Sequence, residues 1–164
     1  MKQYKSGMIL GKFLPLHSGH CYMIEEALKQ CDKLTILVCS LKREVIPGYM
    51  RYTWLKYTFP NANIIHVTDE VPPYPEECDD GNEKFWEIWT DLIKRNTPVD
   101  LDVVFSSEEY GDEIGRRLGL KSVIVDKMRT VVPVSATMIR NQPLENWDMI
   151  PPEVRHYYVK KVCI

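Results

Sequence analysis

Two histidines three residues apart carry the clearest chemical signal in the sequence. His17 and His20 stand in a loop that follows a short apolar run, Met8 to Leu10, and directly precedes a segment with helical periodicity. Gly11 and Gly19 flank the pair, and glycine lets the backbone approach a ligand closely. The first turn of a helix offers free N–H groups and about half a positive charge, which suits phosphate. The spacing puts both imidazoles on one side of that turn, where they add donors for the same anion.

Other interpretations account for the pair less well. Zinc can use two histidines on one helical turn, but it needs further protein ligands or water. Only His66 and His156 remain elsewhere, and the five cysteines include no C-x-x-C pair. Two unrelated surface histidines are the plain alternative. The sequence has neither a G-x-G-x-x-G dinucleotide fingerprint nor a Walker A motif. We therefore predict a phosphate site with no metal ligands from the protein, and we treat His66 and His156 as structural.

A second group of polar residues could hold the same kind of ligand. Ser135 is placed to cap a short helix, on which Thr137 and Arg140 share a face. Two hydroxyls and a guanidinium can hold phosphate. Taken alone, this segment is more typical of a capped surface helix with an exposed arginine. Lys12 and Arg43 follow the first two predicted strands and could also reach phosphate, although solvated surface is the default for either alone.

The composition excludes several classes of protein. Of the 164 residues, 45% are hydrophobic and 27% charged, which suits one globular domain with its own core. The 21 Lys and Arg against 23 Asp and Glu give a net charge of −2, which argues against a nucleic-acid binder. No apolar run approaches the roughly 20 residues of a membrane helix, and we see no secretory signal. The odd number of cysteines predicts no disulfide framework, so we expect a cytoplasmic protein.

Strand and helix patterns alternate along the chain. Apolar and β-branched runs predict strands at 8–10, 34–39, 63–67, 101–105 and 122–125. Helical periodicity predicts helices at 23–31, 51–59, 85–93 and 109–118, with a last one from Pro151–Pro152 through Lys161. A loop at 69–82, rich in proline and acids, is expected to be mobile and close to a site. We predict an α/β fold, a Rossmann-like doubly wound parallel sheet of about five strands with helices on both faces, formed by residues 1–164 as a single domain. Ligands bind such sheets at the C-terminal ends of the strands.

The two phosphate motifs resemble those of a known family. Gly11 to His20 match the pattern G-x-F-x-P-x-H-x-G-H of the HIGH nucleotidyltransferase superfamily, and Ser135 to Arg140 match its partner S-x-T-x-x-R. More narrowly, nearly the whole chain resembles the nicotinamide-nucleotide (NMN) adenylyltransferase domain of NadR-type proteins. The other matching stretches are VCS (38–40), IPG (46–48), FWEIW (85–89), VFSSEEYG (104–111), VDKMR (125–129), VPVSATMIR (132–140) and IPPEVRHYYVKKVCI (150–164).

The resemblance implies an enzyme that joins NMN and ATP to give NAD and pyrophosphate. The NMN phosphate would attack the ATP α-phosphate directly, without a covalent enzyme intermediate. Because this nucleophile is already ionised, catalysis rests on positioning and charge stabilisation. We assign His17, His20 and Arg140 as catalytic, with His20 nearest the α-phosphate. Mg²⁺ is expected on the triphosphate rather than in a protein cage. The other residues assigned to the ATP phosphates are Gly11, Lys12, Phe13, Ser135 and Thr137.

The nucleoside ends are assigned less directly. Trp86 and Trp89 are candidates for the nicotinamide end, because an aromatic face can stack on a cationic pyridinium ring. Both also lie on or beside the apolar stripe of their helix, so we expect one to stack and one to pack in the core. Ser40 is assigned to NMN binding with them. The family pattern assigns the adenosine pocket to Gly19, Tyr110, Gly111, Asp126 and Arg129, although a surface turn explains Tyr110 and Gly111 equally well.

The resemblance also bears on partners. Proteins of this family often continue into a P-loop kinase that phosphorylates nicotinamide riboside, and Val162 to Ile164 resemble the first strand of that junction. Some carry an N-terminal DNA-binding module, for which we expect no room before the first strand. Relatives tend to self-associate, although no interface stripe is recognisable here. The expected partners are ATP, NMN and NAD, and we expect binding to neither nucleic acid nor a membrane. A homo-oligomer and a fused or truncated ribosylnicotinamide kinase domain are further possibilities.

Two rival functions remain at this point. Another nucleotidyltransferase on the same scaffold could use CTP, or an acceptor such as phosphopantetheine. Both phosphate motifs would serve it, but the FWEIW and IPPEVRHYYVKK stretches favour NMN. A non-catalytic sensor could bind NAD without turnover; the intact His17, His20 and Arg140 argue against that function.

Overall fold

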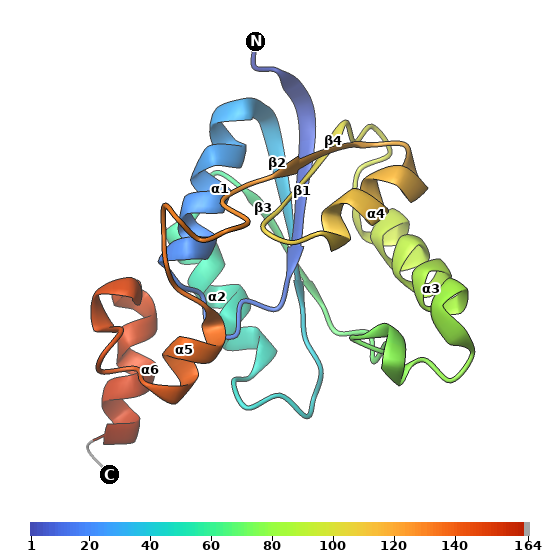
Figure 1. The fold of residues 1–164 in the computed structure, drawn as a ribbon. Helices are drawn as coiled ribbons and strands as arrows, with labels where there is room; N and C mark the ends of the chain where they lie inside the picture. Colours follow the sequence, from blue (N-terminus) through green and yellow to red (C-terminus); the bar gives the residue numbers. More distant parts are fainter. Residues whose placement is uncertain (163–164) are drawn as a thin grey trace.

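The fold is one parallel sheet with helices on both faces (Figure 1). The structure, a computed structural model, describes the backbone of residues 1–162 and the side chains of residues 1–159. The strands lie in the order β3-β2-β1-β4-β5, and all neighbours run parallel. The predicted doubly wound α/β sheet of five strands is therefore confirmed. The strand bounds are β1 Tyr4–Gly11, β2 Cys31–Cys39, β3 Asn63–Val67, β4 Val103–Ser106 and β5 Lys121–Ile124.

The helices lie where the periodicity predicts them. The end of the fourth helix at Gly119 is confirmed, because Gly119 has a φ of 69°, the left-handed conformation that favours glycine. The expected loop at 69–82 contains one short 3₁₀ helix, η1. Within the described residues the helix bounds are α1 Ser18–Gln30, α2 Gly48–Thr58, η1 Pro75–Glu77, α3 Gly81–Asn96, α4 Tyr110–Leu118, α5 Ala136–Asn141, η2 Trp147–Met149 and α6 Pro152–Val162.

The first two strands begin earlier than their apolar runs predict. β1 starts at Tyr4 and β2 at Cys31, and these two residues pair across the sheet. Cys31 was expected on the face of the first helix, but its extended backbone (φ −122°, ψ 148°) makes it the first residue of β2. Exposed polar residues such as Lys5 and Asp32 interrupt the apolar pattern in these strand starts. Backbone pairing extends the strands through these exposed positions to the buried Cys31, so a continuous apolar pattern does not reveal the strand starts.

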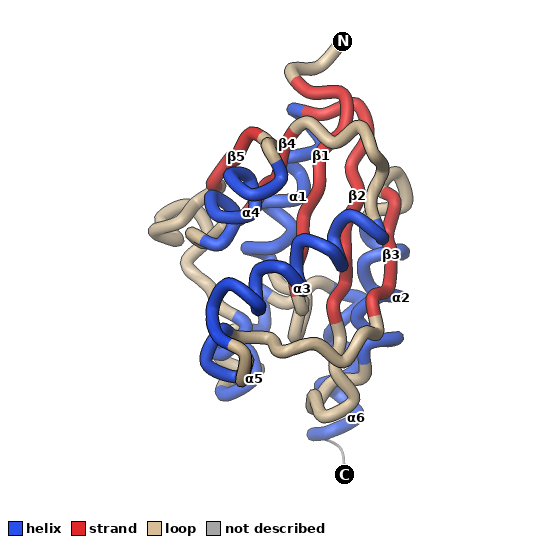
Figure 2. Tube along the Cα trace, turned by 90° about the vertical axis from the view of Figure 1, so that its right-hand side faces the viewer, coloured by secondary structure: helices blue, strands red, loops and turns tan. Residues whose placement is uncertain are grey.

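The two faces of the sheet carry separate apolar clusters. Helices α1 and α2 cover one face, and α3 and α4 cover the other (Figures 1 and 2). Alternation along β1 sends Ile9 into the first cluster and Met8 and Leu10 into the second. Burial on both faces explains why the central strands are continuous apolar runs in the sequence.

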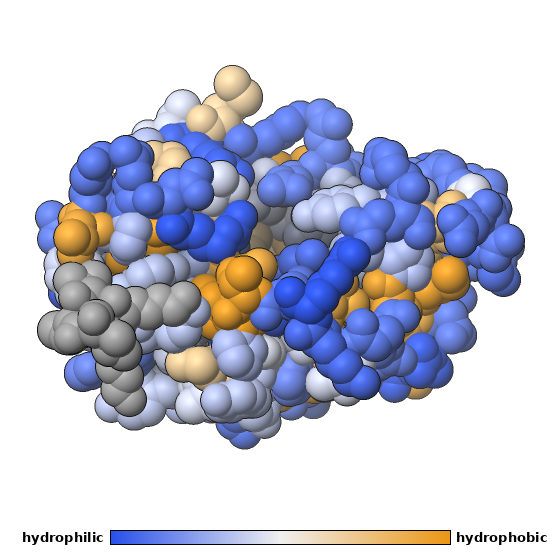
Figure 3. All heavy atoms as spheres, turned by 90° about the horizontal axis from the view of Figure 1, so that it is seen from below, coloured by the Kyte–Doolittle hydropathy of each residue, from blue (hydrophilic) through white to orange (hydrophobic). Residues whose placement is uncertain are grey.

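The order of the strands places the functional end of the sheet. The chain winds outward in one direction from β1 through β2 to β3, and in the other from β4 to β5. The loops that leave β1 and β4 therefore diverge at the C-terminal edge, where a crevice opens. Seen from that edge, the surface is hollowed near its centre (Figure 3).

The last two helices extend the molecule beyond the same edge of the sheet (Figure 1). Helix α6 packs on α2, where the rings of Trp54 and Tyr157 meet edge to face with centroids 6.0 Å apart. The predicted last helix is confirmed and includes Val162; the rest of the strand expected at 162–164 lies outside the described residues. None of the helices in residues 1–162 combines the length and apolarity that crossing a bilayer requires.

Candidate active site

The crevice at the C-terminal edge is a cavity of about 660 Å³. Its walls come from the loops after β1, β4 and β5, from the first turns of α1 and α5, and from residues 73–75 together with α3. Ser40 and Gly111, both predicted to bind substrate, do not line it. The predicted site residues that do line it are Gly11, Lys12, Phe13, His17, Gly19, His20, Trp86, Trp89, Tyr110, Asp126, Arg129, Ser135, Thr137 and Arg140.

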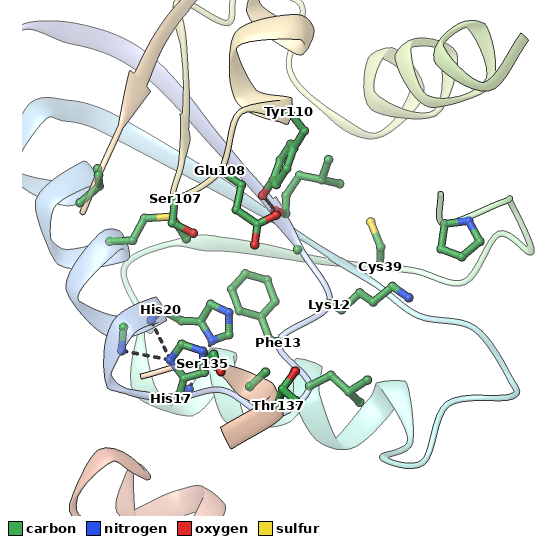
Figure 4. Close-up of a pocket in the computed structure, with 18 of the residues that line it drawn as sticks. Lys12, Phe13, His17, His20, Cys39, Ser107, Glu108, Tyr110, Ser135 and Thr137 are labelled. Carbon is green, nitrogen blue, oxygen red and sulfur yellow. Dashed lines mark hydrogen bonds between the residues drawn. The ribbon is translucent and has the colours of Figure 1, made fainter. Parts of the chain in front are cut away.

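The cavity has chemically different sides (Figure 4). The two histidines, Ser135 and Thr137 lie together on one side. Glu108 and Tyr110 lie on another, on the loop after β4 and the start of α4. Lys12 reaches in beside Cys39, from the ends of β1 and β2. Residues almost 130 positions apart in the chain thus meet around one space.

His17 and His20 form a rigid pair at the start of α1. The Nδ1 atom of His17 accepts the backbone N–H groups of Gly19 (3.1 Å) and His20 (3.3 Å), which caps the helix. In return, Nδ1 of His20 accepts the N–H of His17 at 3.3 Å. The two rings stack with centroids 3.7 Å apart and planes inclined by 24°. The expectation that both imidazoles share one side of the first turn is confirmed.

Both imidazoles are neutral at pH 7. Burial lowers the pKa of His17 to about 4, and the charge of Arg129 adds to the effect. Burial also lowers the pKa of His20 well below its ordinary value, assisted by His17 and Arg129. Because each Nδ1 accepts a backbone N–H, the single proton of each ring lies on Nε2. The pair therefore offers two fixed N–H donors and no charge.

Phe13 supports this pair rather than contacting a ligand with its ring. Its side chain is buried, and its ring meets that of His20 edge to face with centroids 4.9 Å apart. The backbone of Phe13 has a φ of 50°, a left-handed conformation that is uncommon for a residue with a side chain. Phe13 also lines the cavity, and its phosphate contact stays a prediction.

Helix α5 brings a second group of donors to the cavity. The hydroxyl of Ser135 accepts the backbone N–H of Met138 at 3.2 Å, so the predicted helix cap is confirmed. Arg140 donates to the carbonyl of Leu14 at 2.6 Å and to the hydroxyl of Thr137 at 3.3 Å. These bonds join α5 to the loop that carries the histidines. One guanidinium therefore fixes the two halves of the site to each other.

The segment after β5 is organised by Asp126. Its carboxylate accepts the backbone N–H groups of Thr130 (2.8 Å), Val131 (3.0 Å) and Val132 (2.8 Å), and these bonds lower the pKa of Asp126. Asp126 and Arg129 both have left-handed backbones, with φ of 50° and 52°. Asp126 thus holds the loop that presents Arg129, and its oxygens are already engaged before any nucleoside binds.

Two of the predicted contact residues, Ser40 and Gly111, have structural partners of their own. The Ser40 hydroxyl lies 2.7 Å from Nε2 of His66, outside the large cavity. A Cβ atom on Gly111 would lie 2.1 Å from the hydroxyl oxygen of Ser106, so this glycine allows α4 to pack on β4. A Ser–His hydrogen bond and a close contact between a helix and a strand leave no mark in a motif, so the sequence predicts neither of them. Ligand contacts at Ser40 and Gly111 stay predictions.

Tyr110 and the two tryptophans line the cavity and are also anchored to the fold. The Tyr110 hydroxyl donates to the carbonyl of Leu10 at 2.8 Å, and burial raises its pKa. Trp89 donates its indole N–H to the carbonyl of Pro72 at 2.9 Å, which ties α3 to the proline-rich loop. The guanidinium of Arg117 lies 5.5 Å from the ring centroid of Trp86. Neither indole is fully buried, so the expected division into one stacking and one core tryptophan stays a prediction.

Several residues at the site were not found by sequence reasoning. Ser107 and Glu108 line the cavity within the VFSSEEYG stretch, which had been noted only as a family match. Arg51 is completely buried and pairs with Glu44, beneath Lys12. Its one signal in the sequence is a helical face that it shares with the buried Trp54 and Leu55.

Arg43 does not reach the cavity. Its guanidinium pairs with Glu77 at 2.5 Å on the surface, in agreement with the default interpretation of a solvated residue. In the part of the chain that the structure describes, no three His, Cys, Asp or Glu side chains gather as metal ligands.

Comparisons with known proteins converge on one group. A family model described as cytidylyltransferase-like matches residues 8–142. The trifunctional NAD biosynthesis/regulator protein NadR of Escherichia coli K12 is 32% identical over 96% of this chain. The nicotinamide-nucleotide adenylyltransferase of Pyrococcus furiosus is 26% identical over 96% of it. A crystal structure of a NadR protein in complex with NAD and AMP-PNP covers 92% of the chain with a TM-score of 0.62 and 26% identity.

The matched proteins differ in length from this chain. The chain spans 42% of the Escherichia coli relative and 46% of the solved NadR chain. It spans 84% of the Pyrococcus relative. The family match over residues 8–142 includes both phosphate motifs and every residue that lines the cavity.

Proposed function

The chain belongs to the cytidylyltransferase-like family, and on that premise we propose that it joins NMN and ATP to give NAD and pyrophosphate. One observation supports this most strongly: two sets of fixed donors share one cavity, the imidazoles of His17 and His20 and the Ser135–Arg140 group. The names of the relatives, NadR and nicotinamide-nucleotide adenylyltransferase, point to NMN as the acceptor. The cavity volume of about 660 Å³ falls in the range of small-molecule sites.

The proposed reaction is a single displacement at phosphorus. An oxygen of the NMN phosphate forms a bond to the α-phosphorus of ATP, while the bond to the α–β bridging oxygen breaks and the electron pair leaves with pyrophosphate. No proton has to move, because the attacking phosphate is already ionised. The chain's contribution is therefore to align the two phosphates and to stabilise the charge that develops. This account has no covalent enzyme intermediate.

Each side of the cavity has a role in this proposal. The Nε2–H groups of His17 and His20 donate to the α-phosphate, with His20 nearest to it. Arg140 balances charge on the leaving pyrophosphate, and Ser135 and Thr137 hold the same group. Preorganisation makes these donors effective, because the stacked rings and the Arg140 bond to Leu14 are already formed in the free protein.

The two nucleosides occupy opposite ends of the cavity in this proposal. Adenosine lies along Gly19, Tyr110 and the Asp126 loop, with Arg129 presented by that loop. Nicotinamide lies along Trp86 and Trp89. In this proposal Ser40 acts through its hydrogen bond to His66, and Gly111 through the packing of α4 on β4. The proposal treats residues 1–164 as one nucleotidyltransferase domain that acts in the cytoplasm.

Magnesium enters the proposal as part of the ATP substrate. The Asp126 carboxylate in the cavity wall is engaged by three backbone N–H groups, and Glu108 is largely exposed on the rim. Such carboxylates suit a hydrated cation carried on a triphosphate better than an all-protein cage. When bound, Mg²⁺ neutralises part of the phosphate charge, whereas the neutral histidines supply no positive charge.

A panel of substrates tests the proposal. The purified chain is given ATP or CTP with Mg²⁺, combined in turn with NMN, nicotinic acid mononucleotide or phosphopantetheine, and pyrophosphate release is followed. We expect the highest kcat/KM with ATP and NMN. Turnover with CTP or phosphopantetheine but not with NMN would keep the phosphate site and overturn the assignment of the acceptor.

A further inference from the structure

Lys12 is held in place by a carboxylate that the reaction itself does not use. Its ammonium lies 3.0 Å from Oε1 of Glu44 and 5.2 Å from the ring centroid of Tyr74. The Lys12 side chain is one-third exposed and lines the cavity, whereas that of Glu44 is only 6% exposed. Glu44 therefore contacts the ammonium from the protein interior, whereas Lys12 itself lines the cavity.

Glu44 is itself fixed by a buried arginine. Its Oε2 atom lies 2.5 Å from Nη2 of Arg51, whose side chain is completely buried, and also accepts the backbone N–H of Leu41 at 3.0 Å. Burial alone would raise the pKa of Glu44, but the bonds from Leu41, Lys12 and Arg51 outweigh it and lower the pKa. The carboxylate is thus ionised and immobile.

Arg51 also joins the ends of the two central strands. It donates to the carbonyls of Lys12 at 2.6 Å, Cys39 at 3.4 Å and Ile46 at 3.1 Å. Lys12 directly follows β1 and Cys39 ends β2, so Arg51 holds the backbone of Lys12 while its partner Glu44 holds the ammonium. The three charged groups sum to one positive charge, and the one-third-exposed ammonium is the part of the set that lines the cavity.

We propose that Glu44 is a positioning residue, which fixes the Lys12 ammonium toward a substrate phosphate while Arg51 offsets the negative charge of Glu44. This inference rests on the proposed function and deepens it. Without Arg51, the carboxylate would cancel the lysine and repel phosphate. Without Glu44, the flexible four-carbon stem of the lysine would have to be ordered by the substrate, at the expense of binding.

A double-mutant cycle separates this role from a merely structural one. Glu44→Gln is expected to lower kcat/KM for NAD formation about tenfold, because the amide holds the ammonium more weakly. In the Lys12→Ala background the same substitution should lower it less than about twofold, since nothing is left to position. Equal losses in both backgrounds would overturn the inference. Glu26→Gln, which breaks an ordinary Lys–Glu pair on α1, is the matched control.

Binding of inorganic pyrophosphate distinguishes the inference from the proposed function. The dissociation constant (Kd) of pyrophosphate is measured by calorimetry for the wild type, Glu44→Gln, Lys12→Ala and the double variant. Glu44→Gln should weaken binding when Lys12 is present and have little effect when it is absent. If the wild-type chain makes no NAD but the two substitutions are coupled in Kd, only the proposed function is overturned. If the chain makes NAD but the effects of the two substitutions on kcat/KM and Kd are additive, only the positioning role is overturned. If Glu44→Gln fails to fold, Glu44→Asp replaces it. Aspartate keeps the charge beside Arg51 but is one methylene too short to contact Lys12 as well.

Discussion

At the scale of single residues, the site separates hydrogen bonding from charge. His17 and His20 are neutral donors because burial lowers the pKa of each imidazole. Positive charge comes instead from Lys12, Arg129 and Arg140 at the cavity wall. A neutral donor can stay buried at low cost before substrate binds, whereas an imidazolium in the same place could not.

His20 is the residue on which turnover should depend most. His20→Ala removes one fixed donor to the α-phosphate, so kcat should fall about 10²- to 10³-fold. The measurement is the initial rate of NAD formation at saturating ATP and NMN. His156→Ala, at an exposed position on α6, is the control and should leave kcat unchanged. A loss smaller than about tenfold would contradict the donor role.

The pH dependence of stability should reveal the neutral state of His17. Its pKa is about 4 when folded and 6.5 when unfolded, so the unfolded chain takes up the proton more readily. The free energy of unfolding should therefore be unaffected by this residue above about pH 7.5. It should fall by about 3 kcal/mol as the pH drops from 6.5 to 4.

Urea unfolding at several pH values measures this loss. His17→Asn keeps a helix-capping side chain but cannot titrate, so its loss of stability over the same pH range should be smaller. An unchanged pH dependence in the variant would show that His17 is not the group responsible.

At the scale of elements, the sequence predicts what hydrophobic pattern and caps determine. The bounds of β3, the cap at Ser135 and the end of α4 at Gly119 are all as predicted, because each depends on local residues. The early starts of β1 and β2 depend on pairing between strands, which a one-dimensional pattern does not contain.

The candidate site was predicted only in part for a similar reason. Its motif residues do meet in one cavity, but the Glu44–Arg51 support depends on contacts between α2 and the strand ends. The left-handed backbone of Phe13 likewise has no signal in residue type, because aromatic residues rarely adopt that conformation. The close approach of Gly111 in α4 to Ser106 in β4 is likewise absent from any motif.

Gly111→Ala tests whether this glycine serves the packing of α4 or the ligand. In an unhindered helix interior this change would stabilise, but here the new Cβ would lie 2.1 Å from the Ser106 hydroxyl oxygen. We expect a loss of about 1–3 kcal/mol in the free energy of unfolding. Ser106→Gly in the same chain should recover most of it. The KM for ATP should stay near the wild-type value; a raised KM with unchanged stability would return Gly111 to the adenosine pocket.

At the scale of the whole molecule, topology assembles the site. The reversal of strand order between β1 and β4 opens the cavity, and the family match over residues 8–142 includes all the loops that wall it. The path from β5 to α5 then returns across the C-terminal edge, where Arg140 bonds to Leu14. Adenylyl transfer at this cavity requires both motifs to act on one pair of substrates.

The most direct test is the stoichiometry of the reaction in the purified chain. ATP, Mg²⁺ and NMN are incubated with it, and NAD and pyrophosphate are quantified over time by chromatography and a coupled assay. Adenylyl transfer predicts equal amounts of the two products, with formation of both lost in parallel in Arg140→Ala and His20→Ala. A chain that binds NAD tightly but releases no pyrophosphate from ATP and NMN would contradict it and would identify the cavity as a nucleotide sensor.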